Sequence, residues 1–254
     1  MWEAVWLGVV QGLTEFLPVS SSGHLVLLRA FWGQGGGGAV TEIGAHLGTL
    51  VAVVLAYRGR LGPWALGVVR GEAAARHLLG LLVVASLPAV AVGLAVNRWS
   101  SAWFVPAVAA WGWLGSTVAI WATPPPGSQH SVPLQAWTWR QALLVGLAQA
   151  LALCPGLSRS GATVMVARRL GLEPEEAALF SLWMALVAVS GAVVLNLPAL
   201  WEQGARWLPT AATALGAGLL AIRWLRGALS GPHWGRFGWY TLVLASVAFW
   251  WGTR

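Results

Sequence analysis

Membrane-length apolar segments recur along this chain and are separated by short loops that carry most of its charges. A helix needs about 20 residues to cross the roughly 30 Å hydrocarbon core of a bilayer. Six segments approach that length, and we expect each to cross the membrane: 42–57, 77–96, 103–121, 175–197, 208–225 and 237–251. Only 9% of the 254 residues are charged, against about 25% in ordinary soluble domains. The sequence therefore predicts an all-α polytopic membrane protein without a separate soluble domain.

Four further helical segments are too short or too interrupted to cross, and they form two pairs. Residues 2–16 and 23–32 flank a loop at 17–22, and residues 137–153 and 161–170 flank a loop at 154–160. Both loops are rich in Pro, Ser and Gly. Two apolar arms would carry this polar backbone into the membrane, which is typical of a re-entrant helix-loop-helix hairpin.

The two hairpins align without a gap at an offset of 138 residues, as Gln149 against Gln11 shows. Six of sixteen positions from Gly8 to Gly23 are identical in this alignment, which indicates an internal duplication. Each repeat would hold one hairpin and three crossings, and an odd number of crossings inverts the second repeat. We expect one membrane domain, 1–254, with repeat one at 1–122 and repeat two at 137–254. A Pro-rich loop, 123–136, would join them.

Arginine placement predicts the orientation, because cytoplasmic loops are enriched in basic residues. In the six-crossing layout ten arginines fall on the face opposite the N-terminus: Arg58, Arg60, Arg70, Arg76, Arg140, Arg168, Arg169, Arg223, Arg226 and Arg236. The N-terminal face receives four: Arg29, Arg98, Arg206 and Arg254. We therefore expect a multi-pass membrane protein with both termini outside the cytoplasm. The N-terminal stretch has no small-residue cleavage site, so a cleaved signal peptide is not expected.

The first hairpin gathers residues suited to catalysis. Gln11 and Glu15 are four residues apart and share one helical face. Three consecutive hydroxyls and an imidazole follow: Ser20, Ser21, Ser22 and His24. A carboxylate in a membrane segment is costly, and the alternative to a functional role is a Glu15 that only holds helices together. The whole cluster favours function, because it offers a nucleophile, a proton acceptor and a cation ligand.

The second hairpin has the residues of an anion site. Small residues around Gly156 and Gly161 let backbone N–H groups approach a phosphate at a helix N-terminus, and Arg159 can hold two phosphate oxygens. The alternative is an Arg159 that reaches the lipid headgroups. The offset of 138 residues sets Arg159 opposite Ser21. It also sets Ser20 and Ser22 opposite Ser158 and Ser160, so we expect hydroxyl pairs between the two loops.

Together the two motifs resemble those of the undecaprenyl-diphosphatase family, also called UppP or BacA, the bacitracin-resistance family. The first motif is Gln11-x-x-x-Glu15 followed by Pro-Val-Ser-Ser-Ser-Gly-His at 18–24. The second is Pro-Gly-Leu-Ser-Arg-Ser-Gly-Ala-Thr at 155–163. Relatives commonly have Glu where this chain has Gln11. One carboxylate is therefore missing, and metal binding would rest mainly on Glu15 and the substrate's own oxygens.

The resemblance implies a phosphatase that converts undecaprenyl diphosphate to undecaprenyl phosphate and inorganic phosphate, which recycles the lipid carrier of peptidoglycan synthesis and confers bacitracin resistance. It also implies a location in the bacterial inner membrane, a site open to the exterior, and a divalent cation, Mg²⁺ or Ca²⁺, with Glu15 as its protein ligand. Ser21 would attack the terminal phosphorus or position a water, and His24 and Glu15 would divide the proton and metal roles. Arg159 would neutralise the diphosphate. The expected substrate-binding residues are Gln11, Ser20, Ser22, Gln149, Gly156, Ser158, Ser160, Gly161 and Thr163.

Two other classes of function remain. A lipid-phosphate flippase or transporter would also use inverted repeats with broken helices at the membrane midplane. It would not need a nucleophile beside a carboxylate, which favours the phosphatase. A structural scaffold would leave both polar loops without a role. The expected partners are a polyprenyl diphosphate and membrane lipids. Nucleic acid is not expected, because the arginines lie in short loops and form no basic face, and a homodimer is left open.

Overall fold

Every regular element is helical in the residues that the computed structural model describes, which are 2–32, 39–96, 103–127, 131–202, 204–229 and 233–253. The expected all-α class is thus confirmed for these residues. The long and medium helices are α1 (Trp2–Phe16), α2 (Ser21–Trp32), α3 (Ala39–Arg70), α4 (Ala73–Val96), α6 (Pro106–Trp121), α7 (Trp139–Leu151), α8 (Arg159–Arg169), α9 (Pro174–Leu195), α11 (Leu208–Leu229) and α12 (Arg236–Gly252). Short helical turns are η2 (Leu134–Ala136), α10 (Leu197–Glu202) and η3 (Gly204–Trp207).

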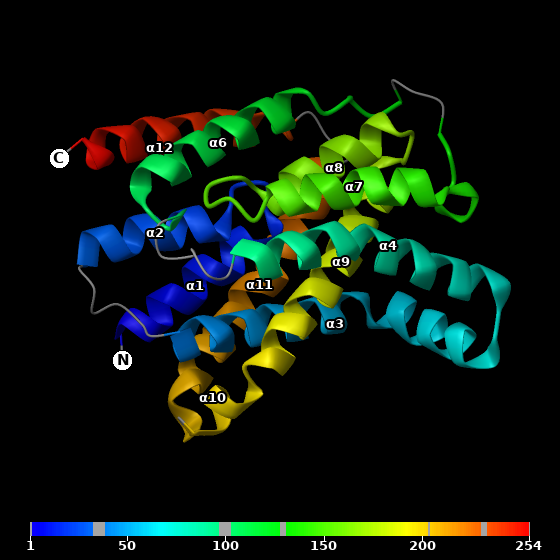
Figure 1. Ribbon diagram of the computed structural model, residues 1–254, viewed down its shortest axis with the longest axis horizontal. Helices are drawn as coiled ribbons and strands as arrows, with labels where there is room; N and C mark the ends of the chain where they lie inside the picture. The colour runs from blue at the N-terminus through cyan, green and yellow to red at the C-terminus, as the bar shows by residue number, and fades with distance from the viewer. Residues whose placement is uncertain are drawn as a thin grey trace.

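The helices form a bundle with an outer layer on one side. Helices α6 and α12 pack against each other, and α6 contacts both α2 and α8 beneath it (Figure 1). Both chain termini lie at the same end of the bundle, and the turn between α3 and α4 lies at the opposite end (Figure 1). The short helices α2 and α8 therefore begin in the interior of the molecule, under the α6–α12 layer.

Two close helix crossings hold the hairpins against the rest of the bundle. Helix α1 packs on α11, and α7 packs on α4. A Cβ atom on Gly8 would lie 2.4 Å from the carbonyl oxygen of Thr210, and one on Gly146 would lie 2.4 Å from that of Ala85. Only glycine permits such an approach of two backbones. Gly8 and Gly146 are 138 residues apart, so the same glycine of each hairpin makes the close crossing.

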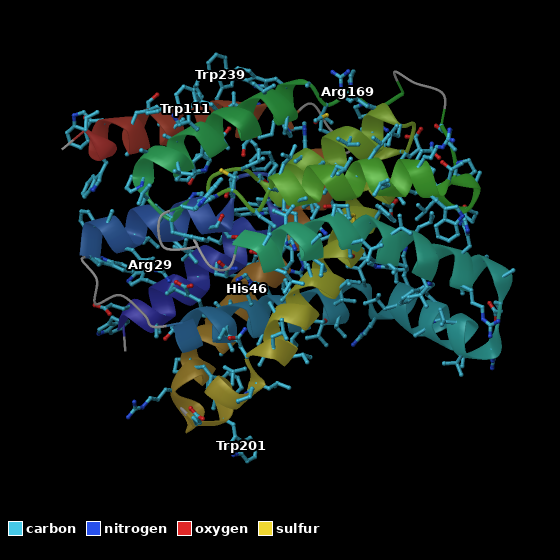
Figure 2. All side chains as sticks on the ribbon, in the orientation of Figure 1. Arg29, His46, Trp111, Arg169, Trp201 and Trp239 are labelled. Atoms are coloured by element: carbon cyan, nitrogen blue, oxygen red, sulfur yellow. The ribbon has the colours of Figure 1, made fainter. Side chains whose placement is uncertain are left out.

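Within the described parts of the chain, three helical stretches are long and apolar enough to cross a membrane: Ala73–Ala95, Pro174–Leu195 and Gly204–Leu229. They coincide with three of the six expected crossings, and the chain is a polytopic membrane protein. Helices α6 and α12 have 16 and 17 residues, slightly below the length of a full span. Trp111 on α6 and Trp239 on α12 point outward and are 67% and 64% exposed (Figure 2). The count of six crossings remains a prediction.

Several helix boundaries differ from those expected. Ser21, Ser22, Arg159 and Ser160 were placed in loops, but they form the first turns of α2 and α8. The segment expected to end at residue 57 does end at a kink, because Tyr57 has non-helical backbone angles, and a second helical stretch follows it to Arg70 within α3. Arg60 in this second stretch donates to Glu175 of α9 at 2.7 Å. Arg98, Arg254 and residues 128–130 of the Pro-rich loop lie outside the described residues.

Candidate functional site

The two hairpin loops are in direct contact. The hydroxyl of Ser160 donates to the carbonyl oxygen of Leu17 at 3.0 Å. A Cβ atom on Gly23 would lie 2.9 Å from the Cα of Gly156, so the start of α2 is packed against the second loop without a gap. The expectation that the loops meet is therefore confirmed. Their contact brings together two motifs that are separated by more than half of the chain.

Each loop caps its own helix by the same pattern of hydrogen bonds. The Ser20 hydroxyl accepts from the N–H of Gly23 at 3.4 Å, and the Ser158 hydroxyl accepts from the N–H of Gly161 at 3.1 Å. Serine is favoured at this position because its oxygen satisfies a backbone donor of the first turn. Ser20 does so with a φ of 66°, a strained value for a residue other than glycine.

The loop hydroxyls do not pair as expected. Ser20 Oγ lies 3.2 Å from Ser22 Oγ, and Ser158 Oγ lies 3.2 Å from Ser160 Oγ. The pairs thus form within each loop, and the expectation of pairs between the loops is wrong. Residues two apart around a helix cap are neighbours, which makes the pairing local.

Helix α6 fixes the position of both loops from outside. Its Trp113 indole donates to the carbonyl oxygen of Val19 at 2.8 Å. The hydroxyl of Ser116 donates to the carbonyl oxygen of Gly156 at 2.8 Å and accepts from the N–H of Ser158 at 2.7 Å. Gly156 has a φ of 86°, which explains why glycine is needed there. These α6 residues carry no sequence signal that marked them as part of the site.

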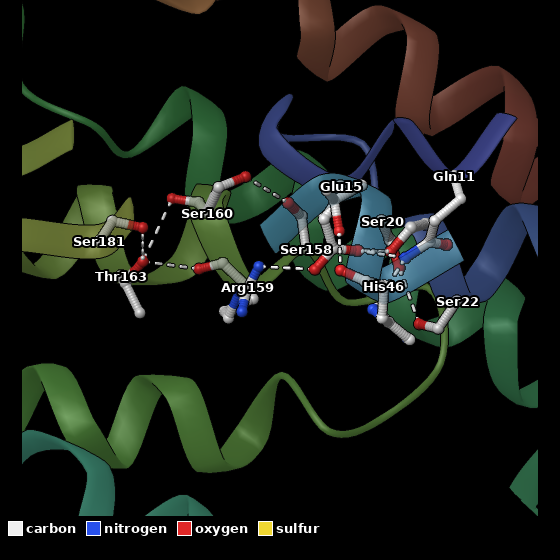
Figure 3. Close-up of polar contacts among 12 residues, drawn as sticks. Gln11, Glu15, Ser20, Ser22, His46, Ser158, Arg159, Ser160, Thr163 and Ser181 are labelled. Carbon is white, nitrogen blue, oxygen red and sulfur yellow. Dashed lines mark hydrogen bonds and ion pairs between the residues drawn. The ribbon is translucent and has the colours of Figure 1, made fainter. Parts of the chain in front are cut away.

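The centre of the site is the Glu15 carboxylate at the end of α1, which is 8% exposed (Figure 3). Its Oε1 accepts from Arg159 Nη2 at 2.7 Å. Its Oε2 accepts from Ser21 Oγ at 2.6 Å and from Gln11 Nε2 at 2.8 Å. Burial of a carboxylate is costly unless it is paired and hydrogen-bonded, and these three donors satisfy that need.

The Ser21–Glu15 contact has the geometry of a nucleophile with its proton acceptor. Their oxygens are 2.6 Å apart, within hydrogen-bond reach. Ser21 is the first residue of α2 and Arg159 the first residue of α8, so both lie where N-terminal N–H groups favour an anion. The expected meeting of Ser21 and Arg159 occurs through the Glu15 carboxylate, which both contact.

A pocket of about 230 Å³ opens beside this carboxylate. Its lining residues come from both hairpins, from α3 and from the segment before α6: Thr14, Glu15, Ser20, Ser21, Ser22, His46, Phe104, Ala152, Leu153, Leu157, Ser158 and Arg159. Six of the expected site residues are among them, namely Glu15, Ser20, Ser21, Ser22, Ser158 and Arg159. Gln11 contacts Glu15 but does not line the pocket.

His24, expected to be catalytic, lies away from the pocket lining. Its Nδ1 is 2.7 Å from the carbonyl oxygen of Ser20, and its Nε2 is 2.8 Å from the hydroxyl of Tyr240 on α12. The ring also stacks on Tyr240 and meets the edge of Trp113. With both nitrogens occupied, His24 links the Ser20 loop to the α6–α12 layer.

The remaining expected binding residues also lie outside the lining. Gly156, Ser160 and Gly161 pack the loops together, as described above. The hydroxyl of Thr163 contacts the carbonyl oxygen of Arg159 and the hydroxyl of Ser181, each at 2.7 Å. Gln149 is 3% exposed, and neither of its side-chain amide atoms has a hydrogen-bond partner among the described residues. The structure thus separates these residues from the Glu15 group.

His46 on α3 is a pocket residue that the sequence reasoning missed. Its Nδ1 lies 3.1 Å from Gln11 Nε2 (Figure 3). The signal that could have found it is its position inside an apolar segment, where an ionisable side chain usually has a function. Its partner is 35 residues away in sequence, so no local motif connects the two.

The residues present do not fit a resident divalent cation. In the described parts of the chain, no group of three or more His, Cys, Asp or Glu side chains is placed to hold a metal ion. Ca²⁺ and Mg²⁺ prefer several oxygen ligands. The site has one carboxylate, whose oxygens already accept from Arg159, Ser21 and Gln11. The side chain of Gln11 directs an amide N–H toward Glu15. A carboxylate at this position would instead have offered a second oxygen ligand.

A larger pocket of about 480 Å³ lies elsewhere, and it has no comparable chemistry. It is bounded by the end of α6, prolines 124–126, Trp234 and Arg168. The Arg168 guanidinium donates to the carbonyl oxygen of Pro125 at 2.8 Å and to that of Leu172. No carboxylate or serine lines this pocket among the described residues. The smaller pocket at Glu15 is therefore the candidate active site, although the other has more volume.

Comparison with known proteins agrees with the motifs. Residues 4–247 match the family described as "Bacitracin resistance protein BacA". An undecaprenyl-diphosphatase of Roseobacter denitrificans is 35% identical over 97% of each chain. Undecaprenyl-diphosphatase 1 of Acinetobacter baylyi is 35% identical over 95% of this chain and 92% of its own. A third, from Dinoroseobacter shibae, is 39% identical over 74% of this chain and 73% of its own. The chain belongs to the BacA bacitracin resistance family.

Proposed function

We propose that this protein is an undecaprenyl-diphosphate phosphatase, which hydrolyses the lipid diphosphate to undecaprenyl phosphate and inorganic phosphate. Family membership and near full-length relatives of that name support the substrate and the reaction. The observation that carries the proposal is the contact of Ser21 Oγ with Glu15 Oε2, beside Arg159 in a pocket. Recycling of the lipid carrier and resistance to bacitracin follow from this activity.

The reaction proceeds in two displacements at the terminal phosphorus. Ser21 Oγ attacks while its proton passes to Glu15 Oε2, and the bond from phosphorus to the bridging oxygen breaks. Undecaprenyl phosphate leaves with that oxygen. Water then attacks the phosphoserine, a proton moves to the released Ser21 oxygen, and inorganic phosphate departs. The leaving group is itself a phosphate, which is stable as an anion and needs little protonation. One proton acceptor therefore suffices for the first displacement.

Arg159 has a second role when substrate binds. In the substrate-free site it neutralises Glu15 at 2.7 Å. A diphosphate brings new negative charge, and the guanidinium fork can hold two of its oxygens together. Transfer of Arg159 from Glu15 to the phosphate would free Glu15 Oε1 from its ion pair, while Oε2 keeps its contact with Ser21. The N-terminal N–H groups of α2 and α8 add to the binding of the anion.

The other expected residues line the pocket or lie around it. Gln11 orients Glu15, and Ser20 and Ser22 line the pocket with hydroxyl donors. Ser158 joins them from the second loop. His24 positions the Ser20 loop through the carbonyl oxygen that it contacts, and it does not touch the substrate. Gly156, Ser160, Gly161 and Thr163 shape the second loop, and Gln149 is buried on α7, the helix that leads into this loop.

A divalent cation, Mg²⁺ or Ca²⁺, would enter with the diphosphate. Substrate oxygens would supply most of its ligands, and Glu15 would be its protein ligand. The poor fit of the free site to a cation supports this order of binding, because the Glu15 oxygens are engaged before substrate arrives. The chemistry of such a cation would be to neutralise phosphate charge.

The membrane arrangement is two inverted repeats in one domain. The equivalent close crossings at Gly8 and Gly146 support the duplication, as do the matching caps at Ser20 and Ser158. Both termini at one end of the bundle (Figure 1) fit an even number of crossings. The arginine distribution supports a position of both termini outside the cytoplasm, and the family resemblance supports an active site that opens to the same side. A homodimer is compatible with this arrangement.

The alternative is a flippase of the same architecture, which would bind the lipid phosphate and move it without cleaving it. Phosphate binding alone would account for Arg159 and the helix N-termini. It would not require a serine hydroxyl at 2.6 Å from a buried carboxylate. That contact favours the phosphatase over transport.

Phosphate release by the purified protein tests the proposal. We expect inorganic phosphate from undecaprenyl diphosphate, and a lower rate with EDTA that added Mg²⁺ or Ca²⁺ restores. Release that EDTA leaves unchanged would contradict the cation proposal alone. Absence of release with and without added cation would contradict the phosphatase and favour the flippase.

A further inference from the structure

His46 presents its Nδ1 to Gln11, and the residue lines the candidate active-site pocket. It lies on α3, outside both hairpins, and lines the same pocket as Ser21 and Arg159. Its Nδ1 is 3.1 Å from Gln11 Nε2. Its Nε2 has no hydrogen-bond partner among the described residues. The position of the ring proton therefore determines whether His46 can donate a hydrogen bond to a bound phosphate.

Glu15 fixes the orientation of the Gln11 amide. Gln11 Nε2 donates to Glu15 Oε2 at 2.8 Å. The opposite orientation of the amide would set its oxygen against a carboxylate oxygen, and two acceptors repel. The amide nitrogen carries two hydrogens. One goes to Glu15, and the other points to His46 Nδ1.

A nitrogen that accepts a hydrogen bond cannot carry a proton of its own there. Nδ1 of His46 is therefore the acceptor, and the single ring proton of the neutral imidazole is on Nε2. The tautomer follows from a chain of contacts that runs from Glu15 through Gln11 to His46.

We infer that His46 is a further substrate-contacting residue, whose Nε2–H donates a hydrogen bond to a non-bridging oxygen of the terminal phosphate. The inference rests on the proposed phosphatase activity. The neutral ring adds a donor without adding a second cation beside Arg159. Since Nε2 already carries its proton, His46 does not remove the proton of Ser21, and that role stays with Glu15. Gln11 is then the residue that determines which ring nitrogen of His46 carries the proton.

The competing explanation is that His46 only wedges Gln11 in place. The two explanations assign opposite atoms of the ring to the function. A donor role depends on Nε2, and a wedge role depends on Nδ1. Substitutions that retain one atom position at a time can separate them.

The matched variants are His46→Gln and His46→Asn. A glutamine amide nitrogen can occupy the place of Nε2 and still donate into the pocket, but it leaves Gln11 without its acceptor. An asparagine amide oxygen can occupy the place of Nδ1 and accept from Gln11, but it ends short of the pocket. We expect His46→Asn to lower kcat for undecaprenyl diphosphate by about 10- to 100-fold, and His46→Gln to lower it less than about fivefold.

The opposite order, with the Asn variant active and the Gln variant impaired, would show that His46 is only a wedge. Equal kcat values in the two variants would also overturn the donor role. Retention volume and melting temperature in detergent establish that both variants are folded before their rates are compared.

The tautomer itself can be measured without any turnover. In ¹⁵N-histidine-labelled protein in detergent, the resonances lost in His46→Asn identify His46. We expect one protonated and one unprotonated nitrogen, with the proton on Nε2 by its couplings to the ring hydrogens. Titration with inorganic phosphate should shift the Nε2 resonance more than the Nδ1 resonance. An Nδ1–H tautomer or an imidazolium at neutral pH would overturn the inference.

The two measurements test the role of His46 separately from the proposed function. If the wild-type protein released no phosphate from the lipid, the phosphatase would fail, and the ¹⁵N measurement would still decide the tautomer and the phosphate contact. If the wild-type protein turned over and the two variants did not differ, only the role of His46 would fail.

Discussion

Ser21 has a hydroxyl whose loss should affect rate more than binding. Its oxygen donates a hydrogen bond to Glu15 Oε2 at 2.6 Å, and no other serine of the pocket contacts Glu15 in the described residues. Removal of an attacking group forfeits several kcal/mol of transition-state stabilisation, at about 1.4 kcal/mol for each factor of ten in rate. We expect Ser21→Ala to lower kcat by at least a thousandfold while the protein still binds undecaprenyl diphosphate.

Ser22→Ala is the matched control for that experiment. The Ser22 hydroxyl lines the same pocket and contacts Ser20 Oγ at 3.2 Å. A neutral hydrogen bond is worth roughly 0.5–1.5 kcal/mol, so the loss should stay near or below tenfold. If Ser21→Ala keeps a tenth of the wild-type kcat while Glu15→Ala abolishes it, the attacking group is a water activated by Glu15. The assignment of the nucleophile would then be wrong, and the reaction would stand.

Arg159 should not tolerate replacement by lysine. Its Nη2 contacts Glu15 at 2.7 Å, and the remaining nitrogens of the fork can hold two phosphate oxygens. Arg159→Lys keeps the positive charge and loses this planar geometry. We expect kcat/KM to fall by roughly 100-fold, measured as initial rates of phosphate release. Near wild-type turnover would mean that only the charge of Arg159 matters.

Helices α4 and α7 should depend on the absence of a side chain at Gly146. A Cβ atom there would lie 2.4 Å from the carbonyl oxygen of Ala85, a distance that no real pair of these atoms adopts. Gly146→Ala therefore forces the helices apart, and overpacking of this kind costs about 1–3 kcal/mol. We expect a lower melting temperature in detergent, together with lower activity, because α7 leads into the second loop.

Gly216 on α11 provides the control for this substitution. A Cβ atom at Gly216 would have no heavy atom within 4 Å apart from its own helix and chain neighbours. Alanine is a better helix former than glycine, so Gly216→Ala should leave the melting temperature unchanged or raise it. A loss in both variants would indicate a general intolerance of substitution and would contradict the role of the close crossing.

For the whole molecule, the orientation in the membrane is the testable property. The two termini lie at one end of the bundle, and the α3–α4 turn with Arg70 and Arg76 lies at the other (Figure 1). We expect alkaline phosphatase fused to either terminus to be active, because it folds only outside the cytoplasm, and a fusion in the α3–α4 turn to be inactive. Inactive fusions at both termini would contradict the orientation, and one inactive terminus would require an odd number of crossings.

The sequence by itself determined that this chain is a helical membrane protein, and it identified the two loops that meet in the structure. Apolar segments of membrane length cannot be reconciled with water, so the polytopic helical class followed directly from hydropathy. The position of Gln11 and Glu15 on one helical face could also be predicted, because it depends only on their spacing of four residues. The duplicated motif identified both loops, and with them Ser21 and Arg159. These features depend on residues that are near one another in the chain.

Only the tertiary structure decided which side chains meet. Glu15 and Arg159 are 144 residues apart, and Gln11 and His46 are 35 residues apart. No periodicity specifies such pairs, because they depend on how helices cross and turn. The packing brought His46 into the pocket. It also turned His24 toward the α6–α12 layer, although His24 is part of the first motif. Sequence pattern places a residue on a helix, and packing between helices determines what that residue contacts.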